Sequence, residues 1–155
     1  MSLEQREALM REALQLAREA ALDGEVPVGC LVLGPDGTVL GRGRNRRERQ
    51  ADATAHAELE AIREACDARG SWRLDGCTLV VTLEPCPMCA GAIINSRVST
   101  LVYGAREPLS GSCGSVIDLF QERYGHAPAV FGGVLAEACA ALLRDFFQGK
   151  RQNDL

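Results

Sequence analysis

Two short segments constrain the fold of this chain more than any other feature of the sequence. They read TAHAE at residues 54–58 and EPCPMC at residues 84–89. We expect each segment at the beginning of a helix, where proline is tolerated in the first turn. The free N–H groups of a helix start favour thiolates. The fold must therefore bring two helix starts together, so that His56, Cys86 and Cys89 reach one centre.

The apolar periodicity of the chain predicts alternating helices and strands. Helices are expected over residues 3–22, 54–69, 87–96 and 136–147, and strands over residues 26–33, 38–43, 77–83 and 98–103. Thr54 is the expected N-cap of the second helix. This alternation predicts an α/β fold, a three-layer α/β/α sandwich with a central mixed sheet of about five strands. No linker or repeat divides the chain, so residues 1–155 are expected to form one domain.

The cysteines indicate free or metal-bound thiols. The count of seven is odd, which argues against a fully paired disulfide framework. Five of them lie among apolar or small residues and are expected to fill the core: Cys30, Cys66, Cys77, Cys113 and Cys139. No apolar stretch approaches the roughly 18 residues of a membrane span, and residues 1–14 do not resemble a signal peptide. A cytoplasmic protein without membrane contact is therefore expected.

The charge balance leaves two interpretations of one arginine-rich segment. A net charge of −4 argues against indiscriminate binding to nucleic acid. Within residues 42–49, however, five arginines lie close together: Arg42, Arg44, Arg46, Arg47 and Arg49. The segment is either a solvated loop or a local basic patch for a nucleic-acid backbone.

The set of potential ligands favours a catalytic zinc site. His56, Cys86 and Cys89 supply three ligands, and catalytic zinc keeps its fourth tetrahedral position for water. The other histidine, His126, lies far away without a flanking cysteine. Glu58 is close enough to move protons to and from a zinc-activated water without being a ligand. The pattern H-x-E followed by P-C-x-x-C is typical of nucleobase deaminases.

Other interpretations of these residues remain open. A thioredoxin-like redox pair would explain the C-x-x-C but would leave His56 and Glu58 without a role. A non-catalytic zinc-stabilised RNA-binding module is a second alternative, although it has no use for the Glu58 carboxylate. A deaminase of a free base or nucleoside, such as guanine or cytosine, is a third. Mixed nitrogen and sulfur ligation favours Zn²⁺, one per subunit, over iron.

Several segments resemble the bacterial tRNA-specific adenosine deaminases, which belong to the cytidine-deaminase-like superfamily. The resemblance is carried by VPVG at 26–29, Asn45, TAHAE at 54–58, VTLEPCPMCAGA at 81–92 and YGAR at 103–106. It extends to CAALLRDFF at 139–147 and covers almost the whole chain. It implies hydrolytic deamination of the wobble adenosine of a tRNA anticodon stem-loop to inosine. It also implies a homodimer with its sites near the subunit interface.

The resemblance assigns roles to residues outside the metal motif. Asn45 would hydrogen-bond the flipped base, and the Glu84 backbone would touch the base or the attacking water. The remaining assigned residues would line the pocket or approach flanking nucleotides: Val26, Pro27 and Leu83 for the pocket, and Arg106, Glu107 and Phe147 for the nucleotides.

The chain departs from its relatives at positions expected to face RNA. It has Glu107 where relatives commonly carry aspartate, and Leu109 where many carry lysine. Residues 125–127 read GHA where relatives have Asn-His-Arg. These changes leave the metal motif intact and alter the expected contacts with RNA, for which the arginine-rich segment is a candidate substitute.

Overall fold

The computed structural model describes residues 1–153 and begins with a long helix, α1 (Leu3–Leu22). Ser2 caps this helix through a capping box, in which its hydroxyl accepts from the Gln5 N–H and the Gln5 side chain accepts from the Ser2 N–H. The expected bounds of 3–22 are confirmed. The apolar face of α1 packs on the sheet through residues such as Met10 and Leu14.

Five strands form one mixed sheet in the order β2-β1-β3-β4-β5. Their bounds are β1 (Gly29–Leu33), β2 (Val39–Arg44), β3 (Thr78–Leu83), β4 (Thr100–Ala105) and β5 (Ala129–Phe131). Strand β1 is antiparallel to both β2 and β3, whereas β3, β4 and β5 run parallel. The expected α/β fold with a mixed sheet of about five strands is therefore confirmed.

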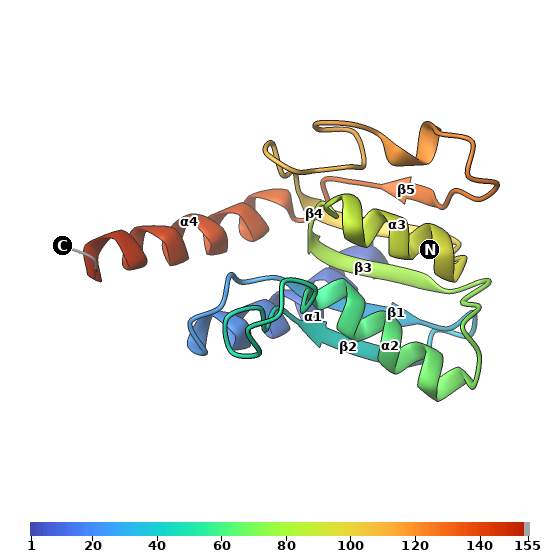
Figure 1. The fold of residues 1–155 in the computed structure, drawn as a ribbon, viewed down its shortest axis with the longest axis horizontal. Helices are drawn as coiled ribbons and strands as arrows, with labels where there is room; N and C mark the ends of the chain where they lie inside the picture. Colours follow the sequence, from blue (N-terminus) through green and yellow to red (C-terminus); the bar gives the residue numbers. More distant parts are fainter. Residues whose placement is uncertain (154–155) are drawn as a thin grey trace.

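Helices cover both faces of the sheet (Figure 1). Helices α2 (Ala57–Arg69) and α3 (Pro87–Ser96) lie on one face, and α1 and α4 (Ala136–Asn153) lie on the other. Strand β1 shows how both faces are used, because Cys30 and Val32 join the core under α2 whereas Leu31 joins the core under α1. The central strands are buried on both sides, as their continuous apolar runs predict.

Two glycines of β2 let α2 lie directly on the sheet. A Cβ at Gly43 would lie 2.7 Å from the Ala61 backbone nitrogen, and one at Gly41 would lie 2.8 Å from that of Ala65. Any larger residue would push the helix away. This close packing sets the position of the α2 start, which carries His56 and Glu58.

The structure differs from the sequence-based expectation in the second half of the chain. Strand β5 and a short 3₁₀ helix, η1 (Leu119–Gln121), were not expected, because β5 has three residues, all exposed, and so no alternating pattern. Helix α4 continues to Asn153 rather than ending near residue 147, and its far part projects beyond the sheet (Figure 1). No helix within residues 1–153 is long and apolar enough to span a membrane.

Candidate active site

The two helix starts predicted from the sequence lie side by side and present the metal-binding residues. His56 is the N-cap of α2, and Cys86 is the N-cap of α3 with Pro87 in the first helical position. The prediction that Thr54 caps α2 is wrong. The Thr54 hydroxyl donates to the Asp52 carboxylate at 2.7 Å, which closes a local turn before the helix.

Three side chains converge on one point between the helix starts. The His56 Nδ1 atom lies 3.7 Å from the Cys86 Sγ and 3.5 Å from the Cys89 Sγ. All three ligand atoms lie within 4.8 Å of one another. The predicted ligand set is therefore assembled by the fold.

These distances fit a tetrahedral zinc ion. Zinc bonds of about 2.3 Å to sulfur and about 2.0 Å to nitrogen place neighbouring ligand atoms about 3.5 Å apart. The observed separations of 3.5 and 3.7 Å between His56 and the two thiols match that value. Three protein ligands, with no fourth His, Cys, Asp or Glu grouped with them in the described part of the chain, correspond to a catalytic rather than a structural site.

Glu58 lies at the same point without belonging to the ligand set. Its side chain is only 4 % exposed, and it lines the same pocket as His56 and Cys86. Burial raises the pKa of the Glu58 carboxyl to about 6, and the nearby His56 acts in the opposite direction. A buried carboxyl with a pKa near neutrality can both accept and release a proton.

The pKa values of the two thiols are shifted in opposite directions. A hydrogen bond from Cys89 lowers the pKa of Cys86 to about 4, and the same interaction together with burial raises the pKa of Cys89 far above its usual range. The surroundings therefore favour ionisation of Cys86 over that of Cys89. The other histidine of the chain is not near the site, because His126 Nε2 lies 2.7 Å from the Val98 carbonyl.

A pocket of about 160 Å³ opens above these residues. His56, Glu58 and Cys86 line it, and we call these three residues, together with the third ligand Cys89, the pocket floor. Five of the residues assigned by resemblance also line it: Val26, Asn45, Leu83, Glu84 and Glu107.

Three other residues assigned by resemblance do not line the pocket. Pro27 is buried beside Val28, and Arg106 is exposed next to Glu107. Phe147 is 43 % exposed on α4, in the helix that projects from the sheet (Figure 1). The exposed Arg106 and Phe147 could therefore reach a substrate larger than a base, whereas the buried Pro27 could not contact it directly.

The pocket also contains residues that the sequence analysis did not assign to it. Val28 and Ala57 add to its walls, and Arg47 and Ser110 lie at its edge. Arg47 belongs to the arginine-rich segment and Ser110 to the glycine- and serine-rich stretch at residues 110–115, but neither pattern distinguishes one residue from its neighbours. We call Asn45, Arg47, Glu107 and Ser110 the pocket rim.

The Asn45 amide is held in one orientation. Its Nδ2 donates to the Val26 carbonyl at 3.4 Å, and its Oδ1 accepts from the Arg47 N–H at 3.2 Å. An amide nitrogen has two hydrogens and its oxygen two lone pairs. Each group therefore keeps one position for a ligand, so the side chain can present a donor and an acceptor together.

Most of the arginine-rich segment is neutralised by the protein itself. Arg44 pairs with Glu19 and Asp23, Arg46 with Glu60, and Arg49 with Asp23. Arg47 is exposed, and its contact with the neighbouring Glu48 is 3.9 Å long. The segment thus consists of the end of β2 and a structured, ion-paired loop, and it leaves Arg47 facing the pocket.

Comparison with known protein families and sequences identifies the same motif. Residues 3–105 match the model of the cytidine and deoxycytidylate deaminase zinc-binding region. The tRNA-specific adenosine deaminase of Bacillus subtilis is 48 % identical over 149 residues, covering 96 % of this chain and 92 % of its own. A Deinococcus deserti protein named tRNA(Ile)-lysidine synthase is 56 % identical over 146 residues, but the chain spans only 27 % of its length.

Solved structures agree with these matches. One from a study of A-to-I editing by tRNA:A34 deaminases at the wobble position superposes with a TM-score of 0.83 at 44 % identity, covering 86 % of this chain and 97 % of the other. A guanine deaminase from Nitrosomonas europaea has a TM-score of 0.78 at 31 % identity, covering 90 % and 83 %. The chain therefore belongs to the tRNA-specific adenosine deaminases within the cytidine and deoxycytidylate deaminase family.

Proposed function

We propose that the protein hydrolyses adenosine to inosine at the wobble position of a tRNA anticodon stem-loop. The observation that carries this proposal is the pocket itself, in which a fixed Asn45 amide faces a floor made of Glu58 and the His56, Cys86 and Cys89 ligand set. The net reaction consumes one water and releases one ammonia, so no other co-reactant is required.

The metal-binding residues and Glu58 have different roles in the proposed reaction. His56, Cys86 and Cys89 would hold a zinc ion, which would supply an activated water for attack on C6 of the purine. Glu58 takes the proton that the water loses and passes protons to the ring nitrogen N1 and the departing amine. The burial of Glu58 limits its contact with bulk water during this exchange.

The walls of the pocket suit a flat base taken out of its stack. Val26, Val28 and Leu83 provide apolar contact, and the Asn45 amide presents the donor and acceptor that a purine edge requires. Glu84 also lines the pocket, and its backbone is a candidate contact for the base. Pro27 supports the wall from behind, since it is buried beside Val28.

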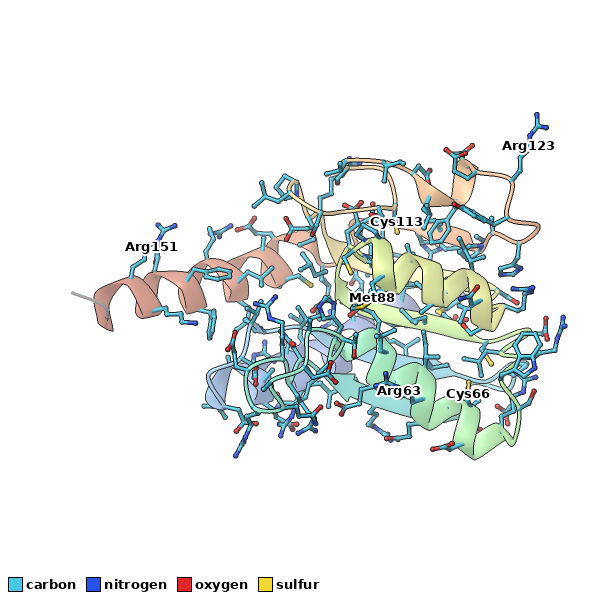
Figure 2. All side chains as sticks on the ribbon, in the orientation of Figure 1. Arg63, Cys66, Met88, Cys113, Arg123 and Arg151 are labelled. Atoms are coloured by element: carbon cyan, nitrogen blue, oxygen red, sulfur yellow. The ribbon has the colours of Figure 1, made fainter. Side chains whose placement is uncertain are left out.

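Flanking nucleotides would lie along the rim and beyond it. Arg106 and Glu107 follow β4 at the edge of the pocket, and Arg47 lies in the facing loop. Phe147 and the projecting part of α4, on which Arg151 lies (Figure 2), are placed to approach more distant nucleotides. An exposed aromatic ring can stack on an unpaired base.

The outer surface of α3 supports a homodimer. The helix carries no charged residue between Pro87 and Ser96, and Pro87 and Asn95 are exposed. Met88 lies half-buried on the same helix (Figure 2). Val116, which precedes η1 in the sequence, is 60 % exposed. We propose that a second copy covers this uncharged surface, which adjoins the zinc ligands at the start of α3.

The cysteines support a reducing compartment. All seven are free thiols, which is the state expected in the cytoplasm. We therefore propose that the protein acts in the cytoplasm. We also propose that residues 1–155 form one deaminase domain.

Product analysis tests the function directly. Anticodon stem-loops with adenosine, guanosine or cytidine at the wobble position, and free guanine and cytosine, are incubated with the zinc-loaded protein. Mass spectrometry should show inosine from the wobble adenosine and no change in the other substrates. Conversion of free guanine or cytosine alone would identify a free-base deaminase, and no product at all would favour a binding module.

A further inference from the structure

Two buried carboxylates lie outside the pocket floor and make no ion pair in the described part of the chain. Glu25 is 1 % exposed and Glu84 is 2 % exposed. Burying a carboxylate is costly unless its oxygens are hydrogen-bonded. The partners of both residues therefore show what each one stabilises.

Glu84 organises the loop that follows β4. Its carboxylate accepts from the backbone N–H groups of Glu107 at 3.2 Å, Cys113 at 3.0 Å and Ser115 at 3.1 Å, and also from the Ser115 hydroxyl. A Cβ at Gly111 would lie 2.5 Å from the carboxyl carbon. The loop is thus wrapped closely around one buried carboxylate; Cys113 lies on it beside α3 (Figure 2).

Glu25 organises the loop that follows β2, which contains part of the arginine-rich segment. One carboxylate oxygen accepts from the Glu48 N–H at 3.0 Å, and the other accepts from the Arg49 N–H at 2.8 Å. These bonds join the segment after α1 to the loop that follows β2, over a sequence separation of more than twenty residues. The loop conformation therefore depends on a residue that is remote in sequence.

The two loops supply the whole pocket rim. The Glu25-held loop carries Asn45 and Arg47, and the Glu84-held loop carries Glu107 and Ser110. Neither carboxylate needs to touch the substrate to affect it, since each fixes backbone atoms next to rim side chains.

We infer that Glu25 and Glu84 are positioning residues, each of which holds one loop of the pocket rim in the conformation that receives the substrate. The inference rests on the proposed function, because it assigns the rim to binding the RNA around the target adenosine. Both residues act through the loops and not on the reacting atoms.

A glutamine would not replace either carboxylate. Both oxygens of a glutamate carboxylate can accept hydrogen bonds. A glutamine amide accepts only through its oxygen, and its NH₂ group would face the N–H donors that the second carboxylate oxygen had accepted from. At Glu84 this would set an N–H group against backbone N–H groups of Cys113 and Ser115 or of Glu107. An aspartate keeps the charge with a shorter reach, so it should restore part of the function.

Glu84→Gln, Glu84→Asp and Glu25→Gln test the inference in the zinc-loaded full chain. Steady-state kinetics on the wobble-adenosine stem-loop should show KM raised about tenfold by each glutamine variant, with kcat changed much less. Glu84→Asp should fall between Glu84→Gln and the wild type. The exposed Glu64 on α2 supplies the control, and Glu64→Gln should leave KM unchanged.

Amide hydrogen exchange separates loop positioning from general destabilisation. In Glu84→Gln, exchange should quicken at Cys113 and Ser115 but not at Glu48 and Arg49, and Glu25→Gln should give the reverse pattern. Ser115→Ala, which removes only the hydroxyl donor, provides a milder variant if Glu84→Gln does not fold, and it should raise KM less.

Three results would overturn the inference: unchanged KM in both glutamine variants, a loss confined to kcat, or faster exchange throughout the protein without loop selectivity. Failure of the proposed function is a separate outcome, since it would appear as absence of inosine with the wild type. In that case the crossed exchange pattern and the Kd of each variant for the stem-loop still decide whether the carboxylates position the rim.

Discussion

The floor and the rim of the pocket are built in different ways. The floor consists of side chains at two helix starts, where the backbone is fixed by the helices and by close packing of α2 on β2. The rim consists of two loops that reach across the pocket and depend on buried carboxylates from elsewhere in the chain. The residues of the floor therefore lie in two short helix-start motifs, whereas the rim residues lie in loops held by hydrogen bonds from residues remote in sequence. Substitutions in the floor should affect the metal and turnover, and those in the rim should affect substrate binding.

The largest effect is expected from a change of metal ligand. Cys86→Ala removes one of three ligands, so zinc content should fall to about a tenth or less of the wild-type value, with loss of activity. Metal analysis by mass spectrometry measures this. Cys66→Ala is the matched control, because Cys66 lies on α2 away from the cluster (Figure 2) and its loss should leave zinc content unchanged. Normal zinc in Cys86→Ala would contradict the ligand set.

Glu58→Gln should separate chemistry from metal binding within the floor. The amide fills the same buried space but cannot shuttle protons, so kcat should fall by about 10³ to 10⁴-fold while zinc content stays normal. Single-turnover rates and metal analysis on one preparation measure both quantities. A variant that turns over at the wild-type rate would remove Glu58 from the mechanism.

Asn45→Ala should produce the largest effect in the rim. It removes a donor and an acceptor directed at the base, and kcat/KM should fall about 10 to 100-fold. Asn45→Asp keeps the acceptor that holds the Arg47 N–H and loses the donor, so it separates loop positioning from base contact. If Asn45→Asp is fully active, the donor is not used on the base.

Arg47→Ala should have the smallest effect of this series. The loss of one exposed cation near the pocket should raise KM a few-fold and reduce its dependence on salt, with zinc and kcat unaffected. Arg42→Ala is the matched control, since Arg42 is an exposed arginine of the same segment that does not line the pocket. Equal effects of both variants would show that the segment acts only through its total charge.

Short-range patterns in the sequence were sufficient to predict the helix starts. Apolar periodicity and proline at the first turn predicted α1 and α3 with their observed bounds, and they predicted α2 with an error of three residues at its start. The error arose because Thr54 has the chemistry of an N-cap but bonds Asp52 instead. Strand β5 carries no such pattern, because a three-residue exposed strand depends on pairing with β4.

The sequence by itself determined the residues of the pocket floor, because three ligands and a carboxylate lie in two short segments whose pattern is typical of nucleobase deaminases. In the rim, the resemblance had assigned only Asn45 and Glu107, and the tertiary structure decided the rest. It showed that Arg44, Arg46 and Arg49 are paired and that Arg47 lines the pocket. It also showed that Glu25 and Glu84 hold the loops through backbone N–H groups more than twenty residues away. Every residue except proline carries a backbone N–H group. The sequence of each loop therefore does not indicate that a remote carboxylate binds its backbone.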